Sequence, residues 1–462
     1  MIDIDQYLDF GFPVDQIKFF ICMMASYPFA MILKRLPNAN MKHILSIVLG
    51  ITYCSFSLGA YSWVHSLISS TVVYILVNVL PRRVAHIYVF VFAMGYMSAS
   101  HWYRMYVDYM GWTMDFTAPQ MVLTLKLTSF AWNLYDGSRP VAELSADEKK
   151  RSIKKIPTLL EFYGFVYYFP TFLAGPTIEI GDYLRYTSGE MFSEFKTIPS
   201  SGFAALKTFV LGLLCFPILT LGGTYTVAYL FTPEFAMEPL YLRVFRMWFH
   251  IVLSRFKYYF GWYVSEGSAI LSGMSYNGLK DGVPTWDRLT NVVPLKVELA
   301  SNIRDVSTYW NMGTADWLKT YVYLRLAPAG TKPSFKSTIG TYAVSAFWHG
   351  FYPGYYIFFV LSAFLTEVAK DIRRKIRPYF VSGPKDTPIQ PFKLGYDIIG
   401  SMITAWFLNF YGASFLILSF DKTLVLWRSF SFMPPIILVG SFFILRFLVP
   451  TPKSQKVVTK YA

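Results

Sequence analysis

The sequence carries little charge. Asp, Glu, Lys and Arg make up only 15% of its 462 residues, whereas 54% are hydrophobic and 19% are aromatic. Soluble domains contain about 25% charged residues. Nearly uncharged runs of about 20 residues recur along the chain, and each is long enough to cross a hydrocarbon core as a helix. The low charge therefore excludes a soluble globular protein and predicts an all-α, polytopic membrane protein.

Cysteine is also scarce. The three cysteines, Cys22, Cys54 and Cys215, lie in apolar segments and form no C-x-x-C pair. Neither a zinc site nor a disulfide framework is predicted, and no metal is expected. The sequence contains no N-x-S/T sequon, and no internal repeat is evident. Its acidic start, MIDIDQYLDFGF, lacks the basic region of a signal peptide, so we expect the first apolar segment to remain as a span.

The net charge of +14 does not indicate a nucleic-acid-binding protein. Lys and Arg gather in short runs beside apolar segments, at 34–35, 82–83, 147–155 and 370–377, rather than along one amphipathic face. Such runs mark cytosolic loops. The first three fall on one side if the first five apolar segments all cross the membrane. This arrangement predicts a lumenal N-terminus.

About eleven membrane segments are expected, with re-entrant or interfacial helices in the middle of the chain. The candidate segments are 15–33, 43–61, 62–80, 84–106, 119–133, 159–176, 203–222, 223–233, 239–272, 336–349, 353–370, 396–419 and 423–449. Segment 119–133 contains Lys126 and is weakly apolar, so an amphipathic interfacial helix is the alternative there. We predict one membrane-embedded domain over 1–462, with a polar tail at 450–462.

Segment 239–272 is interrupted by many charged residues, among them Arg243, Arg246, Arg255 and Glu266. Charged groups at this depth should point into the bundle, pair with one another or line a wet cavity. Within this segment, RFKYY at 255–259 has two interpretations. Its cations and tyrosines either grip a phosphate or anchor the helix end among lipid headgroups.

The longest polar insert, 273–334, follows. Long polar segments of this kind are often functional, and residues 302–326 have a helix-compatible composition. On such a helix Asn311, Thr314 and Leu318 share a face, and Trp310 and Trp317 bracket it. The alternative is an amphipathic helix that lies flat on the membrane with its tryptophans at the headgroups.

One titratable residue stands out in the apolar stretch IGTYAVSAFWHGFYPGYYIFF at 339–359. A buried imidazole loses solvation when charged, so His349 should be neutral and able to accept a proton, as a general base must. Gly350 and Pro353-Gly354 should open or kink the helix there, which at membrane depth indicates the wall of a chamber. The alternative is a core histidine bonded to a neighbouring helix.

Two motifs carry a family resemblance. WNMGTADWLKTYVYLR at 310–325 and SAFWHGFYPGYY at 345–356 resemble the signature of the membrane-bound O-acyltransferase family, in its lysophospholipid acyltransferase branch. Trp286-Asp287, the run at 255–259 and the run at 348–355 are similar to three blocks of that branch. Among its members the chain looks closest to fungal enzymes of broad lysophospholipid specificity. The resemblance implies helices around a central catalytic chamber, with His349 as the catalytic histidine and Asn311 as its asparagine partner.

The implied reaction transfers an acyl group from acyl-CoA, arriving from the cytosol, to a lysophospholipid held in the bilayer. A neutral imidazole at 349 would deprotonate the attacking hydroxyl. Asn311 would either donate to the developing oxyanion or orient the hydroxyl. Acyl-CoA would be a co-substrate, with no tightly bound cofactor, in the endoplasmic reticulum membrane. Further candidates for substrate binding are Trp310, Thr314, Trp348, Tyr352, Tyr355, Arg255, Lys257, Tyr258, Trp286, Asp287, Arg304, Lys319 and Arg325.

Other functions stay open. The nearest alternative is an enzyme of the same family whose acceptor is a sterol, a diacylglycerol or a protein. The three blocks favour a lysophospholipid instead. A lipid transporter or scramblase is the alternative from a different class, because many spans and buried charges also suit transport. The lack of an internal repeat disfavours it. The sequence specifies neither the headgroup, the acyl chain nor the oligomeric state.

Overall fold

The computed structural model describes residues 13–111, 113–327, 331, 333–383 and 386–452. It is 74% helical, which confirms the all-α prediction. The described strands form two short hairpins, β1 (Leu279–Lys280) with β2 (Val283–Pro284) and β3 (Val381–Ser382) with β4 (Thr387–Pro388). Most of the predicted tail, residues 453–462, lies outside the described residues, as does the acidic start at 1–12.

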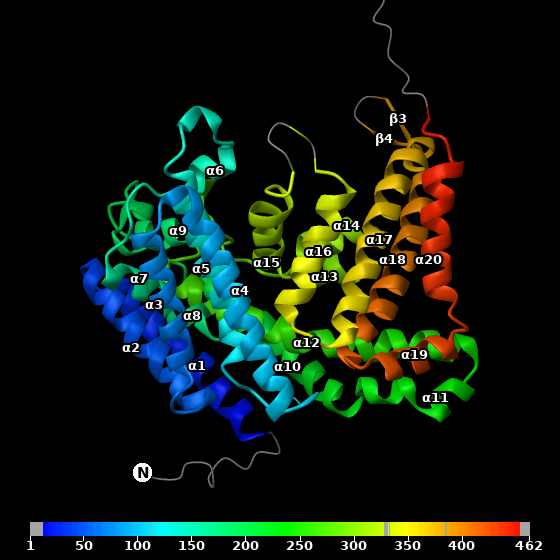
Figure 1. Cartoon of the computed structure of the whole chain (residues 1–462), viewed down its shortest axis with the longest axis horizontal. Coiled ribbons are helices and arrows are strands. Elements are labelled where there is room, and N and C mark those ends of the chain that lie inside the picture. The colour runs from blue at the N-terminus through cyan, green and yellow to red at the C-terminus, as the bar shows by residue number, and fades with distance from the viewer. Residues whose placement is uncertain (1–12, 112, 328–330, 332, 384–385, 453–462) are drawn as a thin grey trace, which may run out of the picture.

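The first half of the chain folds into a block of helices, seen on the left of Figure 1 in blue and cyan. Its longer helices are α1 (Val14–Arg35), α2 (Ala39–Leu58), α3 (Trp63–Val79), α4 (Arg82–Val107) and α5 (Thr117–Asp136). Its shorter helices are α6 (Ala146–Arg151), α7 (Leu159–Val166), α8 (Phe169–Phe172) and α9 (Ile180–Thr187). Buried aromatic side chains such as Phe130, Phe162 and Tyr183 fill one core between them.

A long helix, α12 (Leu240–Ser272), joins this block to the second one. It packs along α10 (Gly202–Thr224), and α11 (Pro233–Met237) precedes it. Its residues enter three cores: Ala269 belongs to the core of the first block, Tyr259 to one shared with α1 and α10, and Met247 to the core of the last helices. The predicted segment 239–272 is thus confirmed as one helix, whereas the predicted segment 223–233 forms a 3-10 turn at Val227–Phe231.

The second block lies on the right of Figure 1, in yellow to red. It consists of α16 (Phe335–His349), α17 (Pro353–Lys375), α18 (Phe392–Ile417), α19 (Phe420–Ser429) and α20 (Met433–Phe443). Phe410, Leu426 and Leu438 are fully buried between α18, α19 and α20. The predicted break after His349 is confirmed, because α16 ends there and α17 begins four residues later.

The polar insert does not form the single helix expected over 302–326. It contains α13 (Pro294–Glu298), α14 (Ile303–Tyr309), α15 (Met312–Trp317) and a π-helical turn, η5 (Leu318–Tyr323). The chain breaks at Asn311, which adopts a left-handed backbone with φ of 45°. Asn tolerates this conformation because its short polar side chain bonds locally. Trp310 and Trp317 consequently join two different cores.

Four helices among the described residues are long and apolar enough to span a membrane: α1, α2, the segment Gly202–Phe231 and α18. Residues 420–429 and 433–448 form a pair that is bent by 86° and would add one more span. The number of about eleven segments therefore stays a prediction. Helices α12 and α17 are also long, but each carries several charged residues and is less apolar than these four.

Helix α5 shows that the interfacial interpretation of segment 119–133 is wrong, because most of its residues are buried. Lys126 is buried too, and its ammonium group donates to the carbonyls of Phe165 and Val166 at the end of α7. Such carbonyls have no partner within their own helix. The charge that made this segment look interfacial thus stabilises a helix end in the interior.

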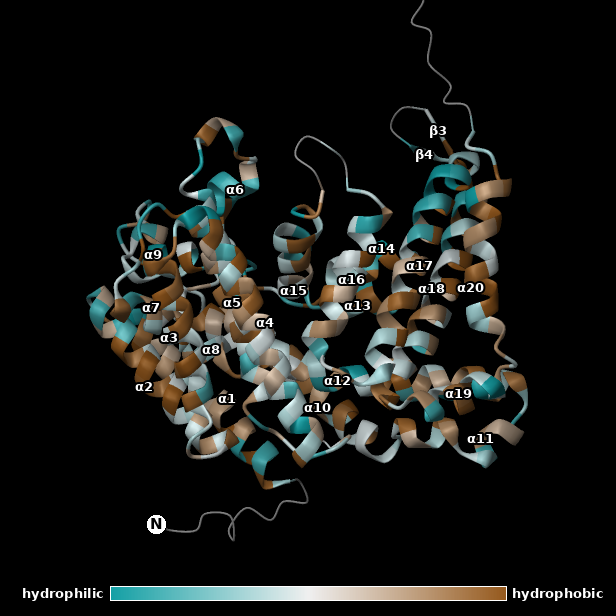
Figure 2. Cartoon of the chain, in the orientation of Figure 1, coloured by the Kyte–Doolittle hydropathy of each residue, from teal (hydrophilic) through white to brown (hydrophobic). Residues whose placement is uncertain are grey.

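Two arginines of α12 pair with carboxylates elsewhere in the chain, as predicted, whereas the buried Nε of Arg243 has no hydrogen-bond partner among the described residues. The Arg255 guanidinium donates to Glu298, with Nε 2.7 Å from Oε1, and Arg246 pairs with Glu238. Figure 2 shows hydrophobic residues along much of α2 and α20, and hydrophilic residues around α6 and the end of α17 near β3. The basic runs beside α6 and at the end of α17 lie at the same end of the molecule, as the predicted topology requires.

The start of α17 allows a direct test of the packing. A Cβ on Gly354 would lie 2.2 Å from the carbonyl oxygen of Ser414 on α18, whereas one on Gly395 would meet nothing within 4 Å. We expect Gly354→Ala to lower the free energy of unfolding by about 1–3 kcal/mol, the usual effect of overpacking. Thermal unfolding in detergent measures this effect. Gly395→Ala is the matched control, and equal melting temperatures for the two variants would contradict the packing argument.

Candidate functional site

A cavity of about 2900 Å³ lies between the two blocks. Residues of α1, α4 and α5 line it from the first block, and residues of α16, α17 and α18 line it from the second. The insert contributes α14, α15 and η5. Segments far apart in the sequence therefore share one chamber, which is the arrangement predicted around His349.

His349 is the last residue of α16, and Gly350 ends the helix with φ of 121°, a conformation that favours glycine. Two hydrogen bonds fix this end to the first block. His101 of α4 donates from Nε2 to the Trp348 carbonyl (2.9 Å), and Trp348 donates from Nε1 to the Met121 carbonyl (3.0 Å). The position of the His349 backbone thus depends on α4 and α5.

The other side of the same turn is fixed as well. The backbone N–H of Met110 donates to the Tyr352 hydroxyl (2.7 Å), and the N–H of Gly354 donates to the Leu418 carbonyl at the end of α18 (2.8 Å). A turn that links two helices is therefore held from both blocks of the protein. Such support keeps a functional side chain in one geometry.

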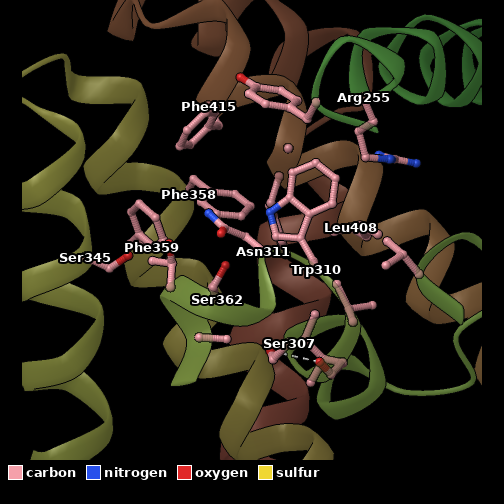
Figure 3. Close-up of a pocket in the computed structure, with 18 of the residues that line it drawn as sticks. Arg255, Ser307, Trp310, Asn311, Ser345, Phe358, Phe359, Ser362, Leu408 and Phe415 are labelled. Carbon is pink, nitrogen blue, oxygen red and sulfur yellow. Dashed lines mark hydrogen bonds between the residues drawn. The ribbon is translucent and has the colours of Figure 1, made fainter. Parts of the chain in front are cut away.

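Aromatic rings surround the His349 imidazole. Phe359 stacks on it at 5.0 Å, Phe415 approaches edge-on at 5.0 Å, and Tyr355 lies at 5.8 Å. Figure 3 shows Phe358, Phe359 and Phe415 projecting into the same cavity. This apolar surrounding favours an uncharged ring. Among the described residues, no group of three or more His, Cys, Asp or Glu side chains is placed to hold a metal ion.

Asn311 also lines the cavity, from the polar insert. It stands at the break between α14 and α15, and its Oδ1 accepts a hydrogen bond from Nδ2 of Asn291 (3.3 Å). Trp310, next to it, packs against the rings of Tyr258, Tyr259 and Trp262 on α12. The tertiary fold thus brings Asn311 and His349 to one chamber across the polar insert.

Most of the residues predicted from the sequence line this chamber. They are Arg255, Lys257, Tyr258, Arg304, Trp310, Asn311, Thr314, Lys319, Trp348, His349, Tyr352 and Tyr355. The cationic residues in this set differ in whether a carboxylate already pairs with them. Arg255 is neutralised by Glu298, whereas Arg304 and Lys319 are exposed and have no ion-pair partner in the part of the chain that the structure describes.

A family model matches residues 102–413, well over half of the chain, and its description is "membrane-bound O-acyltransferase family". The chain belongs to this family. The match confirms the family that the sequence motifs indicated and the prediction of an O-acyltransferase. It includes the whole segment from α5 to the turn after His349, and with it most of the elements that line the chamber.

Relatives in the family extend this match to most of the chain. A lysophospholipid acyltransferase of Schizosaccharomyces pombe is 40% identical over 92% of this chain and 84% of its own length. One of Saccharomyces cerevisiae is 34% identical, over 95% of this chain and 75% of its own length. Human membrane-bound glycerophospholipid O-acyltransferase 2 is 28% identical, over 96% of this chain and 86% of its own length.

Three of the residues predicted from the sequence lie outside the chamber lining. Trp286 packs against Tyr276 and lies under the Lys34 ammonium group, and Asp287 accepts a hydrogen bond from Asn277. Arg325 pairs with Asp136 and Glu148. Conversely, His101 and Asn291 contribute to the site and were missed. A histidine in an otherwise apolar segment was the available signal for His101.

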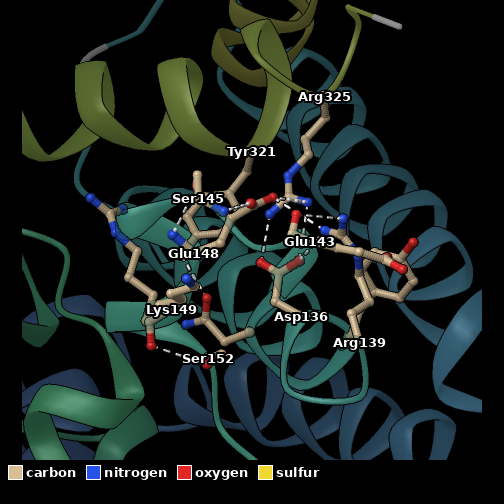
Figure 4. A network of polar contacts seen from close by, with 12 residues as sticks. Asp136, Arg139, Glu143, Ser145, Glu148, Lys149, Ser152, Tyr321 and Arg325 are labelled. Atoms are coloured by element: carbon tan, nitrogen blue, oxygen red, sulfur yellow. Dashed lines mark hydrogen bonds and ion pairs between the residues drawn. The ribbon is translucent and has the colours of Figure 1, made fainter. Parts of the chain in front are cut away.

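Arg325 belongs to a polar network that holds the Asn311 segment in place (Figure 4). Its guanidinium contacts Asp136 at 2.6 Å and Glu148 at 2.8 Å, and Tyr321 donates to Asn133 at 2.8 Å. Partial burial acts to raise the pKa of Glu148, but hydrogen bonds from Ser145 and the charges of Arg325 and Arg139 outweigh it, so this pKa lies below its usual value. The network ties η5 to the end of α5 and to α6.

This network predicts a structural effect of Arg325→Gln. The substitution leaves the carboxylate of Asp136, which is only 2% exposed, without its closest cation. Breaking a pair of this kind costs on the order of 3 kcal/mol. We expect a lower melting temperature in detergent and an unchanged KM for acyl-CoA in the folded fraction.

Arg185→Gln is the control, because its partner Asp182 lies on the same helix and the pair is more exposed. A role for Arg325 in substrate binding would instead raise the KM and leave the melting temperature unchanged.

Proposed function

We propose that this chain transfers a fatty acyl group from acyl-CoA to a lysophospholipid and so regenerates a diacyl phospholipid, in the endoplasmic reticulum membrane. The observation that supports this most is one chamber that both His349 and Asn311 line, in a chain similar to lysophospholipid acyltransferases.

The steps follow from the chemistry of the two side chains. His349 takes the proton of the acceptor hydroxyl as its oxygen attacks the thioester carbonyl. Asn311 acts on the tetrahedral intermediate, in which the former carbonyl oxygen bears the negative charge. The C–S bond then breaks, and the departing CoA sulfur takes the proton back from the imidazolium. An ester and free CoA result, and no metal or redox partner is needed.

A polar track supports entry of acyl-CoA from the basic end. On α16, Thr338, Thr341, Ser345 and His349 line the cavity, and their spacing of three or four residues puts them on one face of the helix. On α17, Ser362 and Thr366 line the cavity between the aromatic residues near His349 and the basic end. Hydroxyl groups along this path suit the amides of the pantetheine arm of CoA.

Cations stand at the same end of the track. Arg373 of α17 lines the cavity and, like Arg304 and Lys319, is exposed and has no ion-pair partner within the described ranges. Tyr323 of η5 lies 6.0 Å from the Lys370 ammonium group, so η5, which carries Lys319, lies beside this part of α17. Exposed cations of this kind suit the nucleotide phosphates of CoA.

Apolar side chains line another part of the chamber. Phe19 and Phe20 of α1, Leu219 of α10 and Phe260 of α12 line it there. This part accommodates acyl chains, which a bilayer substrate brings with it. A chamber with one cationic and one apolar part matches two substrates that arrive from water and from lipid.

The first test compares wild type, His349→Ala and Asn311→Ala. Labelled oleoyl-CoA is offered with a panel of lysophospholipids, a sterol, a diacylglycerol and a peptide. We expect diacyl phospholipid from wild type, a fall of about 10²–10⁴-fold without the base and a fall of about 10²-fold or more without the amide donor. Both variants should still bind acyl-CoA.

If product forms only with the sterol, the diacylglycerol or the peptide, the enzyme is an acyltransferase of the same family with that acceptor instead of a lysophospholipid. If His349→Ala keeps full turnover, the catalytic role of this residue is refuted.

The second test addresses the cations. We expect Lys319→Gln and Arg373→Gln each to raise the KM for acyl-CoA about tenfold, because a hydrogen bond to a phosphate is worth about 1.5 kcal/mol or more. The kcat should change little. An acyl-pantetheine substrate, which lacks the nucleotide, should show no difference. Lys154→Gln, an exposed change in the 147–155 run, is the control, and an equal effect there would indicate general electrostatics only.

A further inference from the structure

Asn291 shows which way round the Asn311 amide is held. Oδ1 of Asn291 accepts the backbone N–H of Gly313 (3.0 Å), and its Nδ2 faces Oδ1 of Asn311 (3.3 Å). A backbone N–H is only ever a donor, so the Asn291 atom that faces Gly313 must be oxygen. The amide nitrogen of Asn291 must then face Asn311, and the Asn311 atom that accepts from it must be oxygen as well.

Because these bonds engage Oδ1 of Asn311, its amide nitrogen, Nδ2, is the atom that can bond to a molecule in the chamber. Nδ2 of Asn311 has no protein hydrogen-bond partner within the described part of the chain. Figure 3 shows the Asn311 side chain directed into the cavity near Phe358 and Ser362. Asn311 therefore presents a hydrogen-bond donor, rather than an acceptor, to a bound substrate.

Asn291 is itself held firmly. It is 1% exposed, and its backbone N–H donates to Oε2 of Glu266 on α12 (3.3 Å). The neighbouring Thr290 hydroxyl donates to Oε1 of the same carboxylate (2.7 Å), and the Asn291 carbonyl accepts from the N–H of Met312 (2.8 Å). These contacts connect α12 through Asn291 to the first turn of α15.

Gly313 is part of this arrangement. A Cβ there would lie 3.3 Å from Oδ1 of Asn291 and 3.1 Å from a methyl group of Thr177. Glycine thus allows Asn291 to approach the backbone of α15. This close approach places the Asn291 amide between the Gly313 N–H, which needs the amide oxygen, and Oδ1 of Asn311, which needs the amide nitrogen.

We propose that Asn291, held by Glu266, is a positioning residue that orients the Asn311 amide so that its Nδ2–H donates to the oxyanion of the tetrahedral intermediate. This rests on the proposed function and selects one of the two roles that the sequence left open for Asn311. Asn291 borders the chamber but is only 1% exposed, so it acts through Asn311. It acts by occupying the oxygen of Asn311, so that the donor is available when the carbonyl oxygen becomes charged.

Asn291→Asp tests the orientation with almost no change in shape. Its carboxylate still accepts from Gly313 but cannot donate to Asn311, whose amide should turn its nitrogen toward position 291 and its oxygen toward the chamber. We expect kcat to fall about 100-fold, as for the loss of one oxyanion donor. The KM values for both substrates should stay within about threefold of wild type. Asn78→Asp, an exposed change on α3, is the control and should be silent.

A double-mutant cycle separates orientation from general damage. In an Asn311→Ala background, Asn291→Asp should lower kcat less than twofold further, because there is no amide left to orient. A full additional 100-fold loss would overturn the proposal. Wild-type kcat in the Asn291→Asp single variant would overturn it too. Melting temperatures of all variants identify any that have unfolded, and Asn291→Ser then replaces a variant that fails to fold.

The two hypotheses fail in different ways. If Asn311→Ala retains full activity, the proposed catalytic role of Asn311 is wrong. If Asn311→Ala is inactive while Asn291→Asp is fully active, only the positioning role of Asn291 is wrong.

Discussion

A polar group inside a membrane protein must find its partner within the protein, because lipid offers none. This constraint explains most of the unusual contacts in the structure. Lys126 donates to the carbonyls at the end of α7, Arg255 is paired with Glu298, and Glu266 accepts from the segment of Thr290 and Asn291. Each contact joins parts of the chain that are distant in sequence. The contacts that satisfy buried polar groups therefore also determine how the insert sits against the helices.

The same constraint shapes the chamber. Its two central residues both stand at backbone breaks, His349 where α16 ends and Asn311 where α14 and α15 meet. A break frees backbone groups that need partners, and here neighbouring elements supply them: Leu418 accepts from Gly354, and Asn291 accepts from Met312 and Gly313. One of these partners, Asn291, also bonds to the side chain of Asn311. A rigid turn and a rigid insert suit a reaction in which an oxyanion must be met by a donor already in place.

Two parts of the chamber differ in a way that fits two substrates. Hydroxyl groups and exposed cations line the path beside α16 and α17, and aromatic and aliphatic side chains line the side toward α1 and α10. A transporter would need the substrate path itself to change, usually through related halves of the chain. The chain instead holds its central turn from both blocks, through His101 on one side and Leu418 on the other. A central turn held in this way favours the proposed reaction chamber over a transport path.

The sequence by itself determined the class of the protein and singled out His349, the residue proposed as the base. Low charge and long apolar runs indicate membrane helices because transfer of a helix into lipid depends on its composition. Gly350 and Pro353 beside a lone imidazole indicate a helix break, because their effect on the backbone is local. Its motifs also indicated the family. Only the tertiary structure decided that Arg325 is engaged with Asp136, that the helix expected over 302–326 breaks at Asn311, and that Asn291 bonds to the Asn311 amide. These features depend on contacts between residues 20 to 189 positions apart, and no local pattern of residues encodes such contacts.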